Sequence, residues 1–193
     1  MRFTLIFLFF MYLPGLIFAD EWHVDTDAQN LVAFTSEVLV LKFTGKTGNI
    51  DGFVYWEGEE MFYQNNQMHF EVDLNTLETG IGKRDRDMRE VLDTQKWQYA
   101  TFDGGIKNPV KIDSSLNTYK LTVIGKMFIH GVERDVETPG TVVIANDGKM
   151  HVICDFSINL SDFNIKAPSL AAFIKVSDNI RLHLDFYLKK AEE

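Results

Sequence analysis

Residues 141–160 read TVVIANDGKMHVICDFSINL, and this stretch carries the clearest indication of the fold. From Met150 onward apolar and polar residues alternate, which places the apolar side chains on one face of an extended strand. The preceding Asp147-Gly148 pair is a strong signal for a tight hairpin turn, because both residue types tolerate the left-handed backbone of such turns. The stretch therefore predicts an antiparallel hairpin of Thr141 to Ala145 with Met150 to Leu160.

The same alternation recurs along the chain and predicts an all-β protein. Two further segments alternate as sharply, Met68 to Leu74 and Ile180 to Leu188. Less sharp strand patterns lie at residues 31–35, 38–44, 50–56, 100–106 and 120–129, separated by turn signals at Gly45, Gly48, Gly58, Gly104-Gly105, Asn117 and Pro139-Gly140. About eight or nine antiparallel strands in one sheet leave two unpaired edges, so we expect a meander closed into an extended β-barrel. We see no linker, and one domain is the simplest interpretation.

Two segments depart from the alternation. Residues 85–92 predict a short helix with Asp85 at its N-cap and one side formed by Met88, Val91 and Leu92. Residues 167–175 predict a loop or another helical turn that covers an apolar site. A barrel of about eight strands is either filled by its own side chains or wide enough for one small ligand, and the alternation leaves both open.

The start of the chain has the pattern of a secretory signal. Arg2 precedes an almost wholly apolar run over residues 3–13, and the small residue Ala19 precedes Asp20. Pro14-Gly15 interrupts the run before it reaches the ~20 apolar residues that a membrane-spanning helix requires. We expect a signal peptide over residues 1–19 and a mature domain over residues 20–193, periplasmic in a diderm bacterium and secreted otherwise.

Charge and cysteine content narrow the classes of function. Residues 1–19 hold one basic and no acidic residue, so their removal changes the formal net charge from −9 to −10. Nucleic-acid binding needs a basic surface and is not expected, and docking onto anionic headgroups is disfavoured. Cys154 is the only cysteine, which excludes an intrachain disulfide and leaves stability to a hydrophobic core. We expect its thiol to be a small buried group.

The spacing of the histidines along the sequence does not match that of metal ligands and does not suggest catalysis. An enzyme needs a converging nucleophile, base and electrophile, and we assign no catalytic or metal-ligating residue. His69, His151 and His183 fall on the polar faces of predicted strands. A zinc site across strands, and with it a metal-dependent barrel enzyme, stays open only if those strands are neighbours. The remaining alternative is a ligand-free barrel that serves as a structural or interaction protein.

Several motifs together resemble the YceI-like family. They occur in the family's order over nearly the whole mature chain: Trp22 to Asp25, Leu74 to Gly80, Lys83 to Arg89, Lys96 to Phe102, Leu121 to Gly125, His130 to Val132 and Phe163 to Ile165. The sequence departs from the family pattern at Trp97-Gln98, where Tyr-Pro is usual, and at Asp135, where a Pro is frequent. Both positions are expected in turns, so they put loop shape in doubt and not the barrel.

The resemblance implies a lipocalin-like barrel that holds a long apolar molecule. Some members of the family hold polyisoprenoid chains or isoprenoid quinones, so we expect an apolar lipid ligand, no other cofactor, transient membrane contact and an undetermined oligomeric state with a dimer as one option. Inward strand positions then line the lumen as a group, together with two residues of a gate at 168–175: Phe34, Phe43, Phe70, Val72, Leu74, Val152, Phe156, Ile158, Leu170, Phe173, Leu182, Leu184 and Phe186. The Arg84-Asp85 pair either contacts a headgroup or pins the short helix to the preceding turn, and we favour the second reading.

Overall fold

The structure is a computed structural model and describes residues 19–38, 41–113, 117–171 and 174–191. Its strands are β1 (Ala19–Val24), β2 (Leu31–Val38), β3 (Leu41–Thr47), β4 (Ile50–Glu57), β5 (Gln64–Asp73), β6 (Tyr99–Asp113), β7 (Thr118–Ile129), β8 (Val132–Ile144), β9 (Met150–Asn159), β10 (Ser169–Ala171), β11 (Ile174–Lys175) and β12 (Asn179–Lys190). The helical elements are α1 (Gly82–Val91) and two short 3-10 turns, η1 (Leu74–Thr76) and η2 (Leu160–Phe163).

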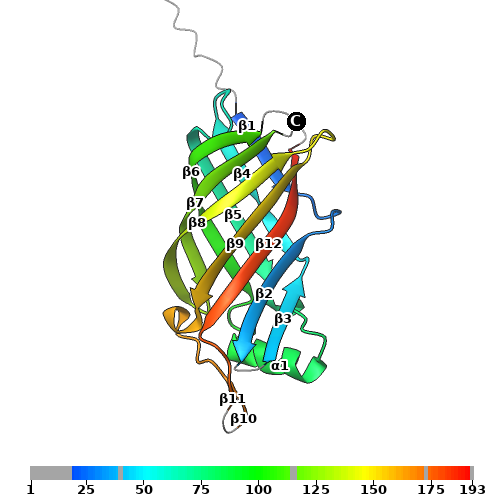
Figure 1. Ribbon diagram of the computed structural model, residues 1–193, viewed down its shortest axis with the longest axis vertical. Helices are drawn as coiled ribbons and strands as arrows, with labels where there is room; N and C mark the ends of the chain where they lie inside the picture. The colour runs from blue at the N-terminus through cyan, green and yellow to red at the C-terminus, as the bar shows by residue number, and fades with distance from the viewer. Residues whose placement is uncertain (1–18, 39–40, 114–116, 172–173, 192–193) are drawn as a thin grey trace, which may run out of the picture.

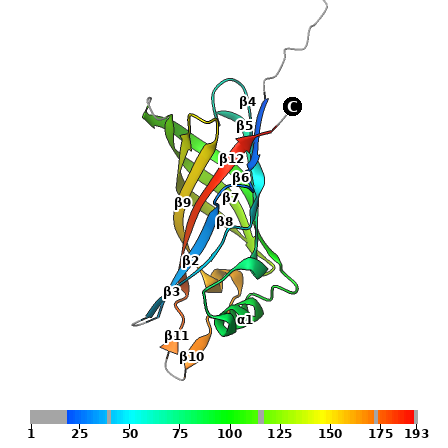
Figure 2. The ribbon, with the colours of Figure 1, turned by 90° about the vertical axis from the view of Figure 1, so that its right-hand side faces the viewer.

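Eight antiparallel strands close into a barrel, as the sequence predicts (Figure 1). Their order is β1-β4-β5-β6-β7-β8-β9-β12, and β1 closes the ring by pairing with the last residues of β12. Earlier residues of β12, from Ile180 to Asp185, pair instead with β2, which carries β3 on its other side. The β2–β3 hairpin therefore continues the wall beside α1, at the end of the molecule opposite the C-terminus (Figures 1 and 2).

The hairpin of residues 141–160 forms as predicted. Gly140 to Ile144 of β8 pair with Met150 to Cys154 of β9, and Ala145 and Lys149 are joined by a backbone hydrogen bond across the turn. Gly148 has a φ of +80°, the left-handed backbone that favours glycine at this position. On β9 the apolar positions face the interior, and the next strand of the barrel, β12, pairs with it along ten residues.

Three of the predicted turns are wrong, because their glycines lie inside long strands. Gly104-Gly105 lies within β6, Pro139-Gly140 within β8 and Gly45 within β3. A Cβ at Gly104 would lie 2.2 Å from the carbonyl oxygen of Ile124, so this glycine permits a close approach of β6 and β7. Pro139 is tolerated because β9 pairs with β8 only from Gly140 onward, so its missing N–H lies beyond the end of that ladder.

The two irregular segments also differ from the prediction. The helix begins at Gly82, with Ile81 as its N-cap, so Asp85 lies in its first turn and is not the cap. Residues 169–171 and 174–175 form two short paired strands, β10 and β11, where a loop or helical turn was expected. No helix among the described residues is long and apolar enough to cross a membrane.

The main hydrophobic core fills the end of the barrel where β1, β4 and β12 meet. Trp56 packs edge-on against Phe62 with ring centroids 4.9 Å apart, and Trp22 stacks on Trp56 at 6.3 Å. Met150 and Leu188 are fully buried in the same cluster. Large side chains in close contact fill this end, which we call the packed end.

Candidate functional site

Strand register arranges the inward side chains of β9, β12, β2 and β3 in rows across the wall. The row nearest α1 contains Ile158, Ile180, Ser36 and Phe43, each paired directly with the next. The second row contains Phe156, Leu182, Phe34 and Gly45. The third contains Cys154, Leu184, Val32 and Thr47. Because the rows are fixed by backbone hydrogen bonding, they give an internal scale of depth along the barrel.

A cavity of about 470 Å³ lies at the α1 end. It reaches the first two rows, where it is lined by Phe34, Ser36, Phe43, Ile158, Ile180 and Leu182. The helix and its ends supply Ile81, Lys83, Arg84, Asp87, Met88, Val91 and Leu92, and other segments supply Leu74, Ile129, Leu160, Ile165, Pro168 and Val176. Its size falls within the range of small-molecule sites, and most of its lining is aliphatic or aromatic. We call this region the hollow end.

One small residue makes room for the aromatic wall of the cavity. The ring of Phe34 lies over Gly45, where a Cβ would come within 2.2 Å of the ring. Phe34 also meets Phe43 edge-on, with centroids 6.1 Å apart. Any larger residue at position 45 would push the Phe34 ring out of this place, so the shape of the cavity depends on this glycine.

The cavity ends where aromatic side chains meet across the barrel interior. Phe70 on β5 and Phe186 on β12 are 5.1 Å apart between ring centroids, although their strands are not paired. Phe186 is 2 % exposed and belongs to the main core. The interior is thus hollow through the second row and packed from the third row onward.

The predicted lining residues divide between these two regions. Phe34, Phe43, Leu74, Ile158 and Leu182 line the cavity. Phe70, Val72, Val152, Leu184 and Phe186 belong to the main core or pack against it, and Phe156 lies half-buried in the second row. Phe173 and the side chain of Leu170 lie outside the described residues, so the predicted gate has no structural test.

Helix α1 is tied to the preceding turn by the Arg84-Asp85 pair. The backbone N–H of Thr79 donates to Asp85 Oδ1 at 2.8 Å, and the Thr79 hydroxyl donates to the same oxygen. The hydrogen bond from this hydroxyl, together with that from the backbone, lowers the pKa of Asp85 despite its burial. Arg84 donates from Nε to Thr79 Oγ1 and from Nη2 to the Thr79 carbonyl oxygen, at 2.8 and 2.7 Å.

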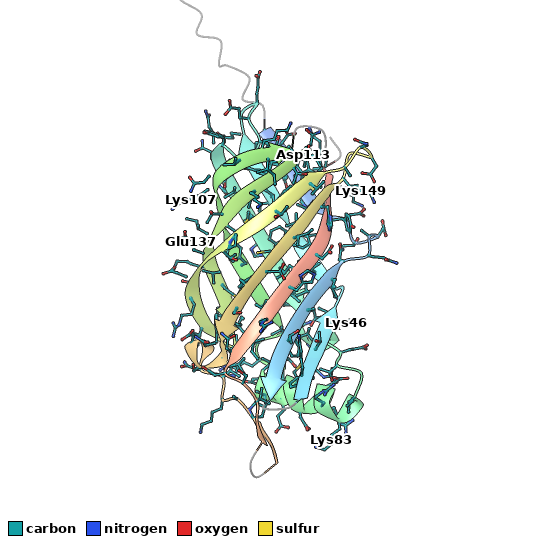
Figure 3. The ribbon with its side chains drawn as sticks, in the orientation of Figure 1. Lys46, Lys83, Lys107, Asp113, Glu137 and Lys149 are labelled. Carbon is teal, nitrogen blue, oxygen red and sulfur yellow. The ribbon has the colours of Figure 1, made fainter. Side chains whose placement is uncertain are left out.

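Arg84 has a second position in the site. Its guanidinium lies over the ring of Phe43, 4.8 Å from the centroid, and it lines the cavity. Lys83 and Asp87 line it too, and form an exposed i,i+4 ion pair at 2.9 Å. Lys83 lies on α1 at the far end of the molecule from Lys149, as Figure 3 shows. The cavity thus has an apolar interior and a charged rim.

Sequence reasoning missed much of the lining. Ser36 was missed because it is polar, although it follows Phe34 by two positions on the inward face of β2. Ile129 and Ile165 belong to a small core cluster around Phe163, formed by segments far apart in sequence. The helical spacing of Met88, Val91 and Leu92 was a usable signal, since all three side chains face the cavity.

The three histidines of the zinc alternative, His69, His151 and His183, each pair with a carboxylate instead of forming a shared site. His69 bonds to Asp103 at 2.7 Å, and His183 to Asp155 at 2.8 Å. The zinc alternative required neighbouring strands, but β5, which carries His69, pairs with β4 and β6 and not with β9 or β12. Within the described ranges the structure contains no cluster of His, Cys, Asp or Glu suited to a metal ion.

Cys154 lies buried in the third row, as expected. Its Sγ donates to the Pro139 carbonyl oxygen at 3.4 Å, and burial raises the pKa of the thiol. A raised pKa keeps the sulfur protonated and unreactive at neutral pH. The residue therefore contributes packing to the region between the two ends of the barrel.

A second hollow, of about 760 Å³, lies along β5 to β8 and has a different character. Its lining includes the charged residues Asp103, Lys107, Lys126, Asp135 and Glu137, and the side chains of Lys107 and Glu137 project outward in Figure 3. In this hollow the side chain of Asn66 on β5 takes the place of a backbone hydrogen-bond acceptor for β6, since its Oδ1 accepts a hydrogen bond from the backbone N–H of Ile106. The apolar cavity at the hollow end is the better candidate for binding an apolar molecule.

Solved structures with the same fold come from several bacteria. The crystal structure of BcnA from Burkholderia cenocepacia has a TM-score of 0.68 and 18 % identity, covering 88 % of this chain and 99 % of that one. A polyisoprenoid binding domain from Saccharophagus degradans, implicated in plant cell wall breakdown, has a TM-score of 0.71 and 18 % identity, covering 88 % and 98 %. The YCEI protein of Campylobacter jejuni has a TM-score of 0.58 and 20 % identity, covering 77 % and 85 %.

These likenesses establish the barrel fold. No curated protein matches the sequence. The model of the YceI-like domain matches residues 22–188, from the start of the barrel at β1 to its closure at β12. The sequence motifs, the closed barrel and this match agree, and the chain belongs to the YceI-like domain family.

Proposed function

We propose that this protein is an exported, non-catalytic carrier that holds a long apolar isoprenoid-type lipid, a polyprenyl chain or an isoprenoid quinone, in the cavity at the hollow end. The observation that carries the proposal is the cavity itself, about 470 Å³ of mostly apolar lining behind a charged rim. The related domain from Saccharophagus degradans is named for binding polyisoprenoids, which supports the same class of ligand here.

The energetics favour exchange of cargo over permanent capture. Burial of apolar surface from water is worth ~25 cal/mol per Å², but a prenyl lipid starts in a bilayer and has already gained that free energy. Transfer between two apolar environments is therefore close to neutral. A protein of this kind can take up and release its lipid at a membrane while preventing its loss to water.

The rim suggests how the hollow end meets a membrane. Ile81 is 54 % exposed and stands beside Lys83 at the start of α1, at the edge of the cavity. An exposed aliphatic side chain next to a cation suits brief contact with the interfacial region of a bilayer. We infer that transient docking at this end lets lipid pass between membrane and cavity.

Organic extraction tests the proposal directly. Protein purified from its native host should release a prenyl lipid, at about one molecule per chain, when its extract is analysed by mass spectrometry. The matched control is Leu182→Trp, which fills the second row of the cavity and should lower the recovered lipid. An extract without prenyl lipid, or the same yield from both proteins, would contradict the proposal.

A further inference from the structure

One polar group faces the cavity from within its apolar wall. Ser36 lines the cavity, is 0 % exposed, and its Oγ has no hydrogen-bond partner among the described residues. Its neighbours in the first row are Ile180 on β12 and Phe43 on β3, both of which also line the cavity. An unpaired buried hydroxyl is costly, so its place in this row needs a physical reason.

The alternation of β2 places the Ser36 side chain on the inward face of the strand. Val32, Phe34 and Ser36 occupy successive inward positions, and the last two line the cavity. Thr35 between them lies on the outer face and contacts Thr44 of β3 at 3.2 Å between hydroxyl oxygens. The Ser36 side chain thus lies on the inward face of β2, in the row that lines the cavity.

We propose that Ser36 is a specificity-determining residue that hydrogen-bonds a single neutral oxygen of the cargo, a hydroxyl or a carbonyl. This inference rests on the proposed lipid-carrier function and adds the chemical class of the polar group. A cargo oxygen at this row satisfies the serine hydroxyl, and the serine in turn satisfies an oxygen that would otherwise be buried among aliphatic groups. A hydrocarbon of the same shape leaves the hydroxyl unpaired.

The surroundings favour a neutral oxygen over a phosphate. Ile158, Ile180 and Phe43 complete the row, and none carries charge. Of the two cations in the cavity lining, Arg84 already donates two hydrogen bonds to Thr79 and lies over the Phe43 ring, and Lys83 is paired with Asp87. A phosphate buried at Ser36 would need a dedicated cation to offset its desolvation.

A competition experiment tests this assignment. Phosphatidylcholine vesicles carry geranylgeraniol and its deoxy hydrocarbon analogue at equal mole fraction, and the ratio of the two lipids bound to the separated protein is measured by mass spectrometry. The ratio for the wild type is then divided by the ratio for Ser36→Ala. Because both proteins take lipid from the same vesicles, the free energies of removing the two lipids from the bilayer cancel in this quotient. We expect a roughly tenfold decrease in preference for the alcohol in Ser36→Ala, the size of one hydrogen bond.

Two control variants distinguish loss of the hydroxyl from a general disturbance. Thr35→Ala removes the adjacent outward hydroxyl and should keep the wild-type ratio. Ser36→Thr retains an inward hydroxyl and should restore most of the preference for the alcohol. Ser36→Ala should also raise the melting temperature of the lipid-free protein, because the substitution removes an unpaired buried hydroxyl. Added geranylgeraniol should raise the melting temperature of the variant by less than it raises that of the wild type.

The outcomes separate the two proposals. Equal ratios for the wild type and Ser36→Ala, with both lipids bound, would overturn the role of Ser36 and leave the carrier function standing. Preference for geranylgeranyl phosphate over the alcohol in a parallel competition would overturn the neutral class of ligand. If neither lipid enters the wild-type protein, the carrier function fails and the assignment of Ser36 fails with it.

Discussion

Strands β9 and β12 run through both the packed end and the hollow end, yet the two ends differ in what fills the interior. At the packed end Trp22, Trp56 and Phe62 meet within 6.3 Å between ring centroids, and Phe70 reaches Phe186 across the barrel. At the hollow end the inward positions of the first two rows hold aliphatic residues, three phenylalanines, a serine and a glycine, and α1 supplies one wall.

The difference shows how one alternating pattern gives both a core and a cavity. Large side chains that meet across the interior exclude a ligand, whereas the wall of the hollow end is held in place by contacts outside the cavity. The Asp85–Thr79 hydrogen bonds fix α1. The backbone β-bridge between Lys46 and Glu78 links β3 to the turn that precedes α1. The hydrophobic core thus fills one end of the barrel, and the space for the proposed ligand lies at the other.

The largest contrast should come from truncating one aromatic residue at each end. Phe186→Ala removes a ring that is 2 % exposed at the packed end, and we expect the free energy of unfolding to fall by roughly 3–5 kcal/mol. Phe34→Ala should cost clearly less, since part of its ring faces the cavity. Chemical denaturation of both variants measures the difference. Equal losses would mean that the two ends are packed alike.

Filling the interior should likewise have opposite consequences at the two ends. Leu182→Trp places the larger side chain where the cavity has space, so we expect loss of bound lipid with a change in stability below about 1 kcal/mol. Leu184→Trp, one row deeper, should overpack the core and cost roughly 1–3 kcal/mol. Lipid content and denaturation midpoints are measured together. A strongly destabilised Leu182→Trp would argue against free space in the second row.

Acid should weaken the wall of the hollow end through Asp85. Its pKa is lowered in the folded protein, so it contributes stability that is present above the unfolded value of about 3.9 and is lost as the pH falls through the folded pKa. Asp85→Asn should lose this contribution at neutral pH and show a flatter dependence of stability on acid. The helical circular dichroism signal and lipid release, followed from pH 7 down to about 2, measure both effects. Identical acid profiles would remove Asp85 from this role.

The smallest effect should come from a polar atom at the packed end. Trp22 Nε1 is buried without a hydrogen-bond partner among the described residues. Trp22→Phe loses apolar contact with Trp56 but also removes an unpaired N–H, so we expect a change within about 1 kcal/mol. Thermal unfolding measures it, with the lipid ratio unchanged. A loss above about 3 kcal/mol would show that the indole N–H has a role that its surroundings do not reveal.

The alternation of apolar and polar residues predicted the fold well where a strand contains no glycine or proline and ends at a clear turn signal. The hairpin at Asp147-Gly148 and the inward face of β9 followed from alternation and turn chemistry, both of which act over a few residues. Gly104, Pro139 and Gly45 misled, because a glycine or proline inside a strand is permitted by the neighbouring strands and not by its own sequence.

The sequence by itself determined which side chains face inward, since alternation in a strand has a period of two residues and needs no partner. Only the tertiary structure decided which inward residues form a core and which line a cavity. Phe34 and Phe186 have the same sequence signal, but Phe186 meets Phe70 across the interior while Phe34 lies over Gly45 beside open space. Such contacts depend on strand register and on where α1 docks, which join residues far apart in the chain.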